Sequence, residues 1–101
     1  MVMSGPNSSH TLDRLFAVIQ DRRARPRPGS YTCQLFAKGS DEIAKKVGEE
    51  AIEVILAASA QGDDRLLSES ADLVYHLLVL LSAHGLTLED LYRELERRMK
   101  P

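Results

Sequence analysis

Acidic side chains recur at helical spacing in two otherwise apolar stretches, KKVGEEAIEVILAA (45–58) and ESADLVYHLLVLL (69–81). On a helix with 100° per residue, the acids of the first stretch share an arc of about 100° with Lys46. Those of the second lie with His76 on an arc of about 60°. Nearly all other positions around both helices are apolar, so each predicted helix carries one acidic stripe. The acids are Glu49, Glu50, Glu53, Glu69 and Asp72.

A short turn between the two stretches brings these stripes together. The segment 61–64 is brief enough to favour an antiparallel pair of neighbouring helices. Glu53 lies eight residues before this turn and Asp72 eight after it, so each is roughly 12 Å from it at 1.5 Å per residue. Glu50 and Glu69 lie about one turn to either side. Four carboxylates therefore converge if the stripes face each other.

Convergent carboxylates favour a bound divalent cation. Like charges in a poorly solvated site are costly unless they are protonated, paired or bound to metal. Mg²⁺, with Mn²⁺ as a substitute, prefers oxygen ligands and binds through carboxylates together with substrate phosphates. The alternative is an exposed helix on which the glutamates of 49–53 form ion pairs with Lys45 and Lys46. The predicted metal ligands are Glu50, Glu53, Glu69 and Asp72.

Basic and aromatic residues near these stripes are candidates for binding a nucleotide polyphosphate. Lys46 shares the acidic arc, whereas the other cations lie in or beside the segment 22–39, whose prolines and glycine interrupt any helix. The alternative to substrate binding for this segment is a solvated loop without a ligand. The alternative for His76 is a core residue whose hydrogen bonds are made within the protein. The substrate-binding candidates are Lys46, Lys38, Arg22, Arg25, Tyr31 and His76.

The periodicity of the chain predicts an all-α fold. Apolar stripes indicate helices over 12–21, 40–60, 63–84 and 88–99, with a long basic loop over 22–39. Period-two alternation is short and aromatic residues make up only 5%, which disfavours strands. We therefore predict a bundle of about four helices over 11–101, completed by dimerisation, after a disordered tail over 1–10.

Composition narrows the classes of protein further. The chain has 101 residues, and its 13 basic and 15 acidic side chains give a net charge of −2. Its longest apolar stretch, 73–81, contains His76 and is shorter than the roughly 20 residues of a membrane span. The first ten residues lack the pattern of a secretory signal, and Cys33 is the single cysteine. These features predict a cytoplasmic protein without a membrane span, and so small a domain would gain stability from a homodimer.

The order of motifs resembles a known family. EEAIE (49–53) followed by ESAD (69–72) is similar to the signature of the all-α nucleotide pyrophosphohydrolases. Together with PGSYT (28–32), LFAKG (35–39) and KKVGEEAIEV (45–54), it resembles the phosphoribosyl-ATP pyrophosphohydrolase family of histidine biosynthesis over residues 11–100.

The resemblance implies Mg²⁺-dependent cleavage of phosphoribosyl-ATP between its α and β phosphates, which yields phosphoribosyl-AMP and pyrophosphate. It also implies the metal ligands Glu50, Glu53, Glu69 and Asp72. Glu49 would orient or deprotonate the attacking water, or act as a further ligand. The catalytic candidates on this basis are Glu49, Glu50 and Glu53.

Two alternatives remain open at this point. The same carboxylates suit a house-cleaning enzyme that hydrolyses ordinary or damaged nucleoside triphosphates. The second alternative is a non-enzymatic helical module that binds nucleic acid through the basic loop. This alternative predicts salt-sensitive binding to nucleic acid that does not need the carboxylates. We expect a nucleotide substrate and no nucleic-acid partner.

Overall fold

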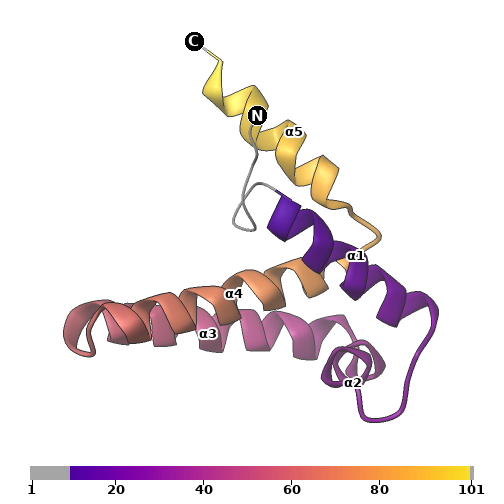
Figure 1. Ribbon diagram of the computed structural model, residues 1–101, viewed down its shortest axis with the longest axis horizontal. Helices are drawn as coiled ribbons and strands as arrows, with labels where there is room; N and C mark the ends of the chain where they lie inside the picture. Colours follow the sequence, from indigo (N-terminus) through magenta and orange to yellow (C-terminus); the bar gives the residue numbers. More distant parts are fainter. Residues whose placement is uncertain (1–9, 101) are drawn as a thin grey trace.

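The computed structural model describes residues 10–100, which form five helices and no strand (Figure 1). The helices are α1 His10–Ala24, α2 Tyr31–Lys38, α3 Ser40–Ala60, α4 Asp63–Ala83 and α5 Leu88–Met99. The predicted all-α class is confirmed, with one helix more than expected. The tail predicted over 1–10 lies outside the described residues except for His10, which begins α1.

The two longest helices, α3 and α4, lie side by side as an antiparallel hairpin (Figure 1). Gly62 makes the turn between them with φ of 89°, a left-handed conformation that glycine adopts without strain. At the open end of the hairpin, the Ser40 hydroxyl lies 2.7 Å from His84 Nε2. The predicted bounds of both helices therefore agree with the structure to within a residue or two.

The prediction of a long loop over 22–39 is wrong, because most of these residues are helical. Helix α1 continues to Ala24, and α2 begins after Ser30, whose hydroxyl accepts a hydrogen bond from the Cys33 backbone N–H at 3.2 Å. Gly39, with φ of 95°, ends α2 and starts α3 within a single residue. Only residues 25–30 connect α1 to α2, so the basic segment is held closely between two helices.

The core lies where α1 and α2 meet the open end of the hairpin. Phe16 and Ile19 of α1 pack with α4, and Leu88 at the start of α5 closes the cluster. Burial of such side chains typically contributes about 1.5–3 kcal/mol each. The buried apolar side chains of this core are Phe16, Ile19, Leu35, Ile43, Leu78, Val79 and Leu88.

Helix α5 extends away from the hairpin (Figure 1). Thr87 caps its first turn: the Thr87 hydroxyl accepts from the Asp90 N–H at 3.1 Å, and the Asp90 carboxylate accepts from the Thr87 N–H at 2.9 Å. This reciprocal pair satisfies two N–H groups that an uncapped helix leaves free. Leu88 is the one buried residue of α5, and Leu95 and Met99 are exposed.

The hairpin exposes large apolar side chains outside this core. Ile52, Ile55 and Leu56 form an exposed stripe on α3, and on α4 Leu67 is 71% and Val74 38% exposed. We call these five residues the hairpin face. By length and composition α4 could also cross a membrane, a test that core helices of soluble proteins pass as well. A single chain thus leaves this apolar surface uncovered.

Candidate metal centre

Three of the predicted ligands come together between the two long helices. Glu50 on α3 and Glu69 and Asp72 on α4 each offer a carboxylate oxygen, and these oxygens all lie within 4.8 Å of one another. Glu69 and Asp72 are three residues apart and so share a face of α4, and the antiparallel hairpin places Glu50 opposite them. The predicted convergence of the two acidic stripes is present for these three side chains.

The three carboxylates differ in their access to water. Glu69 is buried at 6% exposure, Glu50 is half-buried and Asp72 is exposed. Arg65, four residues before Glu69 on α4, forms an ion pair with its carboxylate. The sequence interpretation overlooked this partner, although the i,i+4 spacing of opposite charges would have revealed it. Arg65 thus offsets part of the cost of burying Glu69.

The donor set fits a hard divalent cation. All three groups supply carboxylate oxygens, and no thiol or imidazole that would favour zinc belongs to the group. Two oxygens bound to one hard cation lie at most about 4–5 Å apart, twice the metal–oxygen distance. The oxygens of this group, all within 4.8 Å of one another, satisfy that limit for a cation as large as Ca²⁺ and lie slightly beyond the limit of about 4.2 Å for Mg²⁺. They also leave most positions around such an ion open for water or phosphate oxygens.

The two remaining predicted acids of α3 lie outside this group. Glu53, one turn after Glu50, is exposed. Glu49 forms an ion pair with Lys46, whose Nζ lies 3.5 Å from Glu49 Oε1. Both side chains of that pair are well exposed, so it contributes little stability. The alternative interpretation of an exposed, ion-paired helix therefore describes Glu49 but not Glu50.

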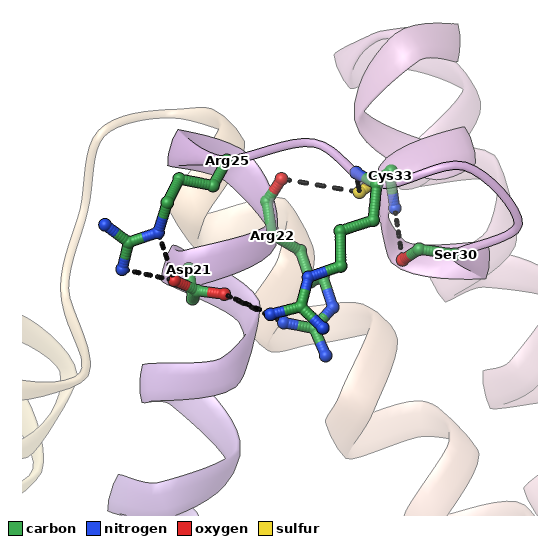
Figure 2. Close-up of polar contacts among 6 residues, drawn as sticks. Asp21, Arg22, Arg25, Ser30 and Cys33 are labelled. Atoms are coloured by element: carbon green, nitrogen blue, oxygen red, sulfur yellow. Dashed lines mark hydrogen bonds and ion pairs between the residues drawn. The ribbon is translucent and has the colours of Figure 1, made fainter.

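The basic residues at the end of α1 gather around one carboxylate. Arg25 Nη2 lies 2.5 Å and Arg22 Nη1 2.8 Å from opposite oxygens of Asp21, as Figure 2 shows. Arg27 Nη2 lies 3.7 Å from the same side chain. The hydrogen bond from Arg25, and then the charges of the three arginines, lower the pKa of Asp21. Arg22 and Arg25, both predicted to bind substrate, are thus held by an internal anion.

Cys33 of α2 contacts the end of α1 and the connection between the two helices (Figure 2). Its thiol donates to the Arg22 carbonyl at 3.4 Å and accepts from the Arg27 N–H at 3.3 Å. The hydrogen bond with Ser30, followed by that from the Arg27 N–H, lowers the pKa of the Cys33 thiol. These contacts hold residues 25–30 between α1 and α2.

Replacing Asp21 with Asn should make the stability of the protein less dependent on acid pH. A carboxyl whose pKa is lowered by folding stabilises the native state above its unfolded pKa, about 3.9, and loses that effect as the pH falls through the folded pKa. Asp21→Asn should therefore lower the melting temperature by a few degrees at pH 7, and by less as the pH falls toward 3.

Thermal unfolding followed by circular dichroism from pH 3 to 7 measures this difference. Asp41→Asn, which removes an exposed acid of α3, is the matched control. High salt should shrink the Asp21 effect because exposed ion pairs are screened. An equal loss of stability at pH 3 and pH 7 would show that ionisation of Asp21 plays no part.

The other predicted substrate-binding residues occupy two places. Lys38 ends α2 and is exposed. Tyr31 begins α2, and its hydroxyl lies 3.0 Å from Nε2 of His76 on α4. His76 is buried at 5% exposure, with Nδ1 2.8 Å from the Asp72 carbonyl oxygen. Both ring nitrogens of His76 have hydrogen-bond partners within the protein, as expected if His76 is a core residue. One of these partners, Tyr31, is itself a candidate for binding substrate.

Comparison with known proteins assigns nearly all of the described region to one family. The profile of the family described as phosphoribosyl-ATP pyrophosphohydrolase matches residues 12–99. A phosphoribosyl-ATP pyrophosphatase of Pyrobaculum calidifontis is 55% identical over 93 residues, which cover 92% of this chain and 99% of the relative. One from Sulfurisphaera tokodaii is 53% identical with the same coverage. The three clustered carboxylates fall within the matched residues.

Proposed function

This chain belongs to the phosphoribosyl-ATP pyrophosphohydrolase family, and from that premise we propose that it hydrolyses phosphoribosyl-ATP in the second step of histidine biosynthesis. The bond cleaved joins the α and β phosphates, and the products are phosphoribosyl-AMP and pyrophosphate. Mg²⁺ is the cofactor, with Mn²⁺ as a substitute. The observation that carries the proposal is the group formed by Glu50, Glu69 and Asp72 in a chain of this family.

The metal ligands on this proposal are Glu50, Glu69 and Asp72, joined by Glu53 from the next turn of α3. A bound Mg²⁺ would neutralise phosphate oxygens and acidify a water molecule. Arg65 supports the site by holding the Glu69 carboxylate in place. Glu53 is exposed and therefore free to change rotamer toward the substrate.

Glu49 orients the attacking water or takes its proton. Its exposed carboxylate is paired with Lys46 beside the metal ligand Glu50. Lys46, one turn earlier on the same face of α3, contacts a phosphate oxygen and brings a positive charge to the leaving pyrophosphate. Because the Lys46–Glu49 pair is well exposed, exchanging it for contacts with substrate costs little.

The cations of α1 and α2 bind the remaining phosphates. Lys38 is exposed at the end of α2. Arg22 and Arg25 bind Asp21, and together with Arg27 they leave an excess of positive charge around one carboxylate. A phosphate oxygen that replaces the Asp21 oxygens would make the same charge-assisted hydrogen bonds.

The protein works as a homodimer in this proposal. The hairpin face exposes five large apolar side chains along two adjacent helices, which is unusual for a surface that meets only water. A second copy of the hairpin would cover it and complete a four-helix bundle. Helix α5, with Leu95 and Met99 exposed, is a second surface available to the partner subunit.

We place the enzyme in the cytoplasm, without a membrane or nucleic-acid partner. The apolar composition of α4 is explained by its packing on α3 and by the proposed subunit contact. Three of the arginines that favoured nucleic-acid binding form one small group around Asp21, and the net charge of the chain is −2. Neither feature suits a surface that must neutralise a polyanionic backbone.

Pyrophosphate release from phosphoribosyl-ATP is the direct test. We expect turnover with Mg²⁺, partial or full replacement by Mn²⁺, and loss of at least about 99% of the rate in EDTA, because the carboxylates alone supply no positive charge for the phosphates. ATP, dUTP and dCTP are assayed in parallel. Hydrolysis of these nucleotides but not of phosphoribosyl-ATP would favour the house-cleaning alternative and contradict the proposed substrate.

A further inference from the structure

Three aromatic rings pack together where α2 meets α4. The Tyr31 ring stacks on Tyr75, with centroids 6.2 Å apart and an interplanar angle of 28°. His76 contacts both rings edge-on, with centroids 5.9 Å from Tyr31 and 5.0 Å from Tyr75. Edge-to-face and offset-stacked geometries are the favourable ones for aromatic pairs. The three rings therefore form one ordered unit, which we call the aromatic cluster.

Hydrogen bonds fix the orientation of this cluster. The Asp72 carbonyl can only accept, so His76 Nδ1 carries the proton, and in the neutral ring Nε2 then accepts from the Tyr31 hydroxyl. The Tyr75 hydroxyl is hydrogen-bonded to Thr32 of α2. Burial raises the pKa of Tyr75, so its hydroxyl stays protonated at neutral pH. The aromatic cluster is held by polar contacts at both tyrosines.

The aromatic cluster also adjoins the carboxylate group. Tyr75 and His76 follow Asp72 by three and four residues, which places all three side chains on one face of α4. Tyr31 is nevertheless 47% exposed. The Tyr31 ring is thus held by a buried histidine, half open to water and one helical turn from the carboxylate group, and nucleobases stack on aromatic rings that are open in this way.

We propose that the exposed ring of Tyr31, backed by Tyr75 and held by His76, is the surface on which the base of the nucleotide stacks. This inference rests on the proposed function, because it assigns the base of that substrate to a place beside its phosphates. Every nucleobase has a π-face, and stacking on an aromatic side chain strengthens binding without consuming hydrogen bonds. His76 is a positioning residue in this scheme, since its contact with substrate passes through Tyr31.

Steady-state kinetics of ring and hydroxyl variants test the assignment. Tyr31→Leu removes the ring and should raise KM for phosphoribosyl-ATP about tenfold or more, with kcat within about twofold of wild type. Tyr31→Phe keeps the ring and should raise KM only about two- to threefold. Tyr92→Leu, the same change at the third tyrosine of the chain, should leave KM unchanged.

A double-mutant cycle tests the part assigned to His76. Asn at position 76 keeps a donor for the Asp72 carbonyl but lacks the atom that accepts from Tyr31. Tyr31→Phe and His76→Asn therefore break the same hydrogen bond, so the double variant should raise KM no further than the larger single effect. Additive effects on KM would overturn the positioning role.

Fluorescence provides a measurement that does not depend on turnover. The chain has no tryptophan, so Tyr31→Trp introduces a single reporter at the proposed surface. Saturating α,β-methylene ATP, which the enzyme cannot cleave between the α and β phosphates, should quench this emission. Inorganic triphosphate, which lacks a base, should bind without the same quenching.

The outcomes separate this inference from the proposed function. Equal quenching by both probes, or an unchanged KM for Tyr31→Leu in an enzyme that turns over phosphoribosyl-ATP, would overturn base stacking and leave the proposed reaction intact. A wild-type protein without turnover would contradict the proposed reaction, while quenching by α,β-methylene ATP alone would still support the base-binding surface. A lower melting temperature of Tyr31→Leu with normal KM would make the aromatic cluster a structural contact only.

Discussion

Replacing Glu50 with glutamine, or Asp72 with asparagine, should lower the kcat for phosphoribosyl-ATP on the order of a thousandfold. Each change removes one anionic oxygen from the group that lies within 4.8 Å, and the neutral amide is a much weaker ligand for Mg²⁺. Excess Mg²⁺ should restore only part of the rate. Pyrophosphate release across a Mg²⁺ titration measures both effects.

The same variants should fold normally. Three carboxylates in one place repel each other in the metal-free protein, so removing one charge should leave the melting temperature unchanged or raise it by a few degrees. Mg²⁺ should stabilise the wild type by binding the native state and should stabilise the variants less. These opposite effects on activity and stability distinguish a ligand from a structural residue.

Glu96→Gln provides the matched control for these changes. It removes one exposed carboxylate from α5, away from the group, and should retain wild-type kcat and the wild-type response to Mg²⁺. Near-full turnover by Glu50→Gln or Asp72→Asn would contradict the assigned metal centre. Loss of activity in all three variants would instead point to a general effect of charge.

Replacing Ile55 with aspartate should dissociate the proposed dimer. Ile55 is 64% exposed in the single chain, so the substitution disturbs no core contact of the monomer. In a two-fold interface the change occurs twice, and each copy would bury a charge in place of an apolar side chain. We expect the dissociation constant to rise by at least about a hundredfold. Analytical ultracentrifugation at several protein concentrations measures it.

Val18→Asp tests whether the effect belongs to the hairpin face. Val18 is 47% exposed on α1, so this control introduces the same charge at a comparable apolar residue outside that surface. It should leave the dimer intact. Dissociation by Val18→Asp alone would move the interface to α1, and a wild-type protein that sediments as a monomer would contradict the dimer itself.

Local sequence patterns were sufficient to locate the long helices. Residues 40–60 and 63–84 were predicted almost as they occur, because an apolar periodicity sustained over about 20 residues, ended by Gly62 and Gly85, leaves few alternatives. Helix α2 was missed. It has eight residues and follows Pro26, Pro28 and Gly29, so its helical signal is too short to stand out from that interrupted segment.

The two acidic stripes could also be predicted from the sequence. Which charged side chains contact each other was harder to predict. Helical spacing alone placed Glu69 and Asp72 on one face, and the short turn suggested that Glu50 would approach them. The same reasoning included Glu53, which the structure leaves exposed and outside the group. The stagger of two helices decides which glutamate of α3 lies opposite Glu69 and Asp72, and the part of Glu53 as a further ligand stays a prediction.

The sequence by itself determined the helical class, the two acidic stripes and the family to which they point. These properties follow from the 3.6-residue repeat, which any short window of sequence expresses. Only the tertiary structure decided which carboxylates meet, that Tyr31 reaches His76 across 45 positions, and that Arg22 and Arg25 share Asp21. Such contacts depend on how helices rotate and slide against each other, and packing of the whole core sets that arrangement.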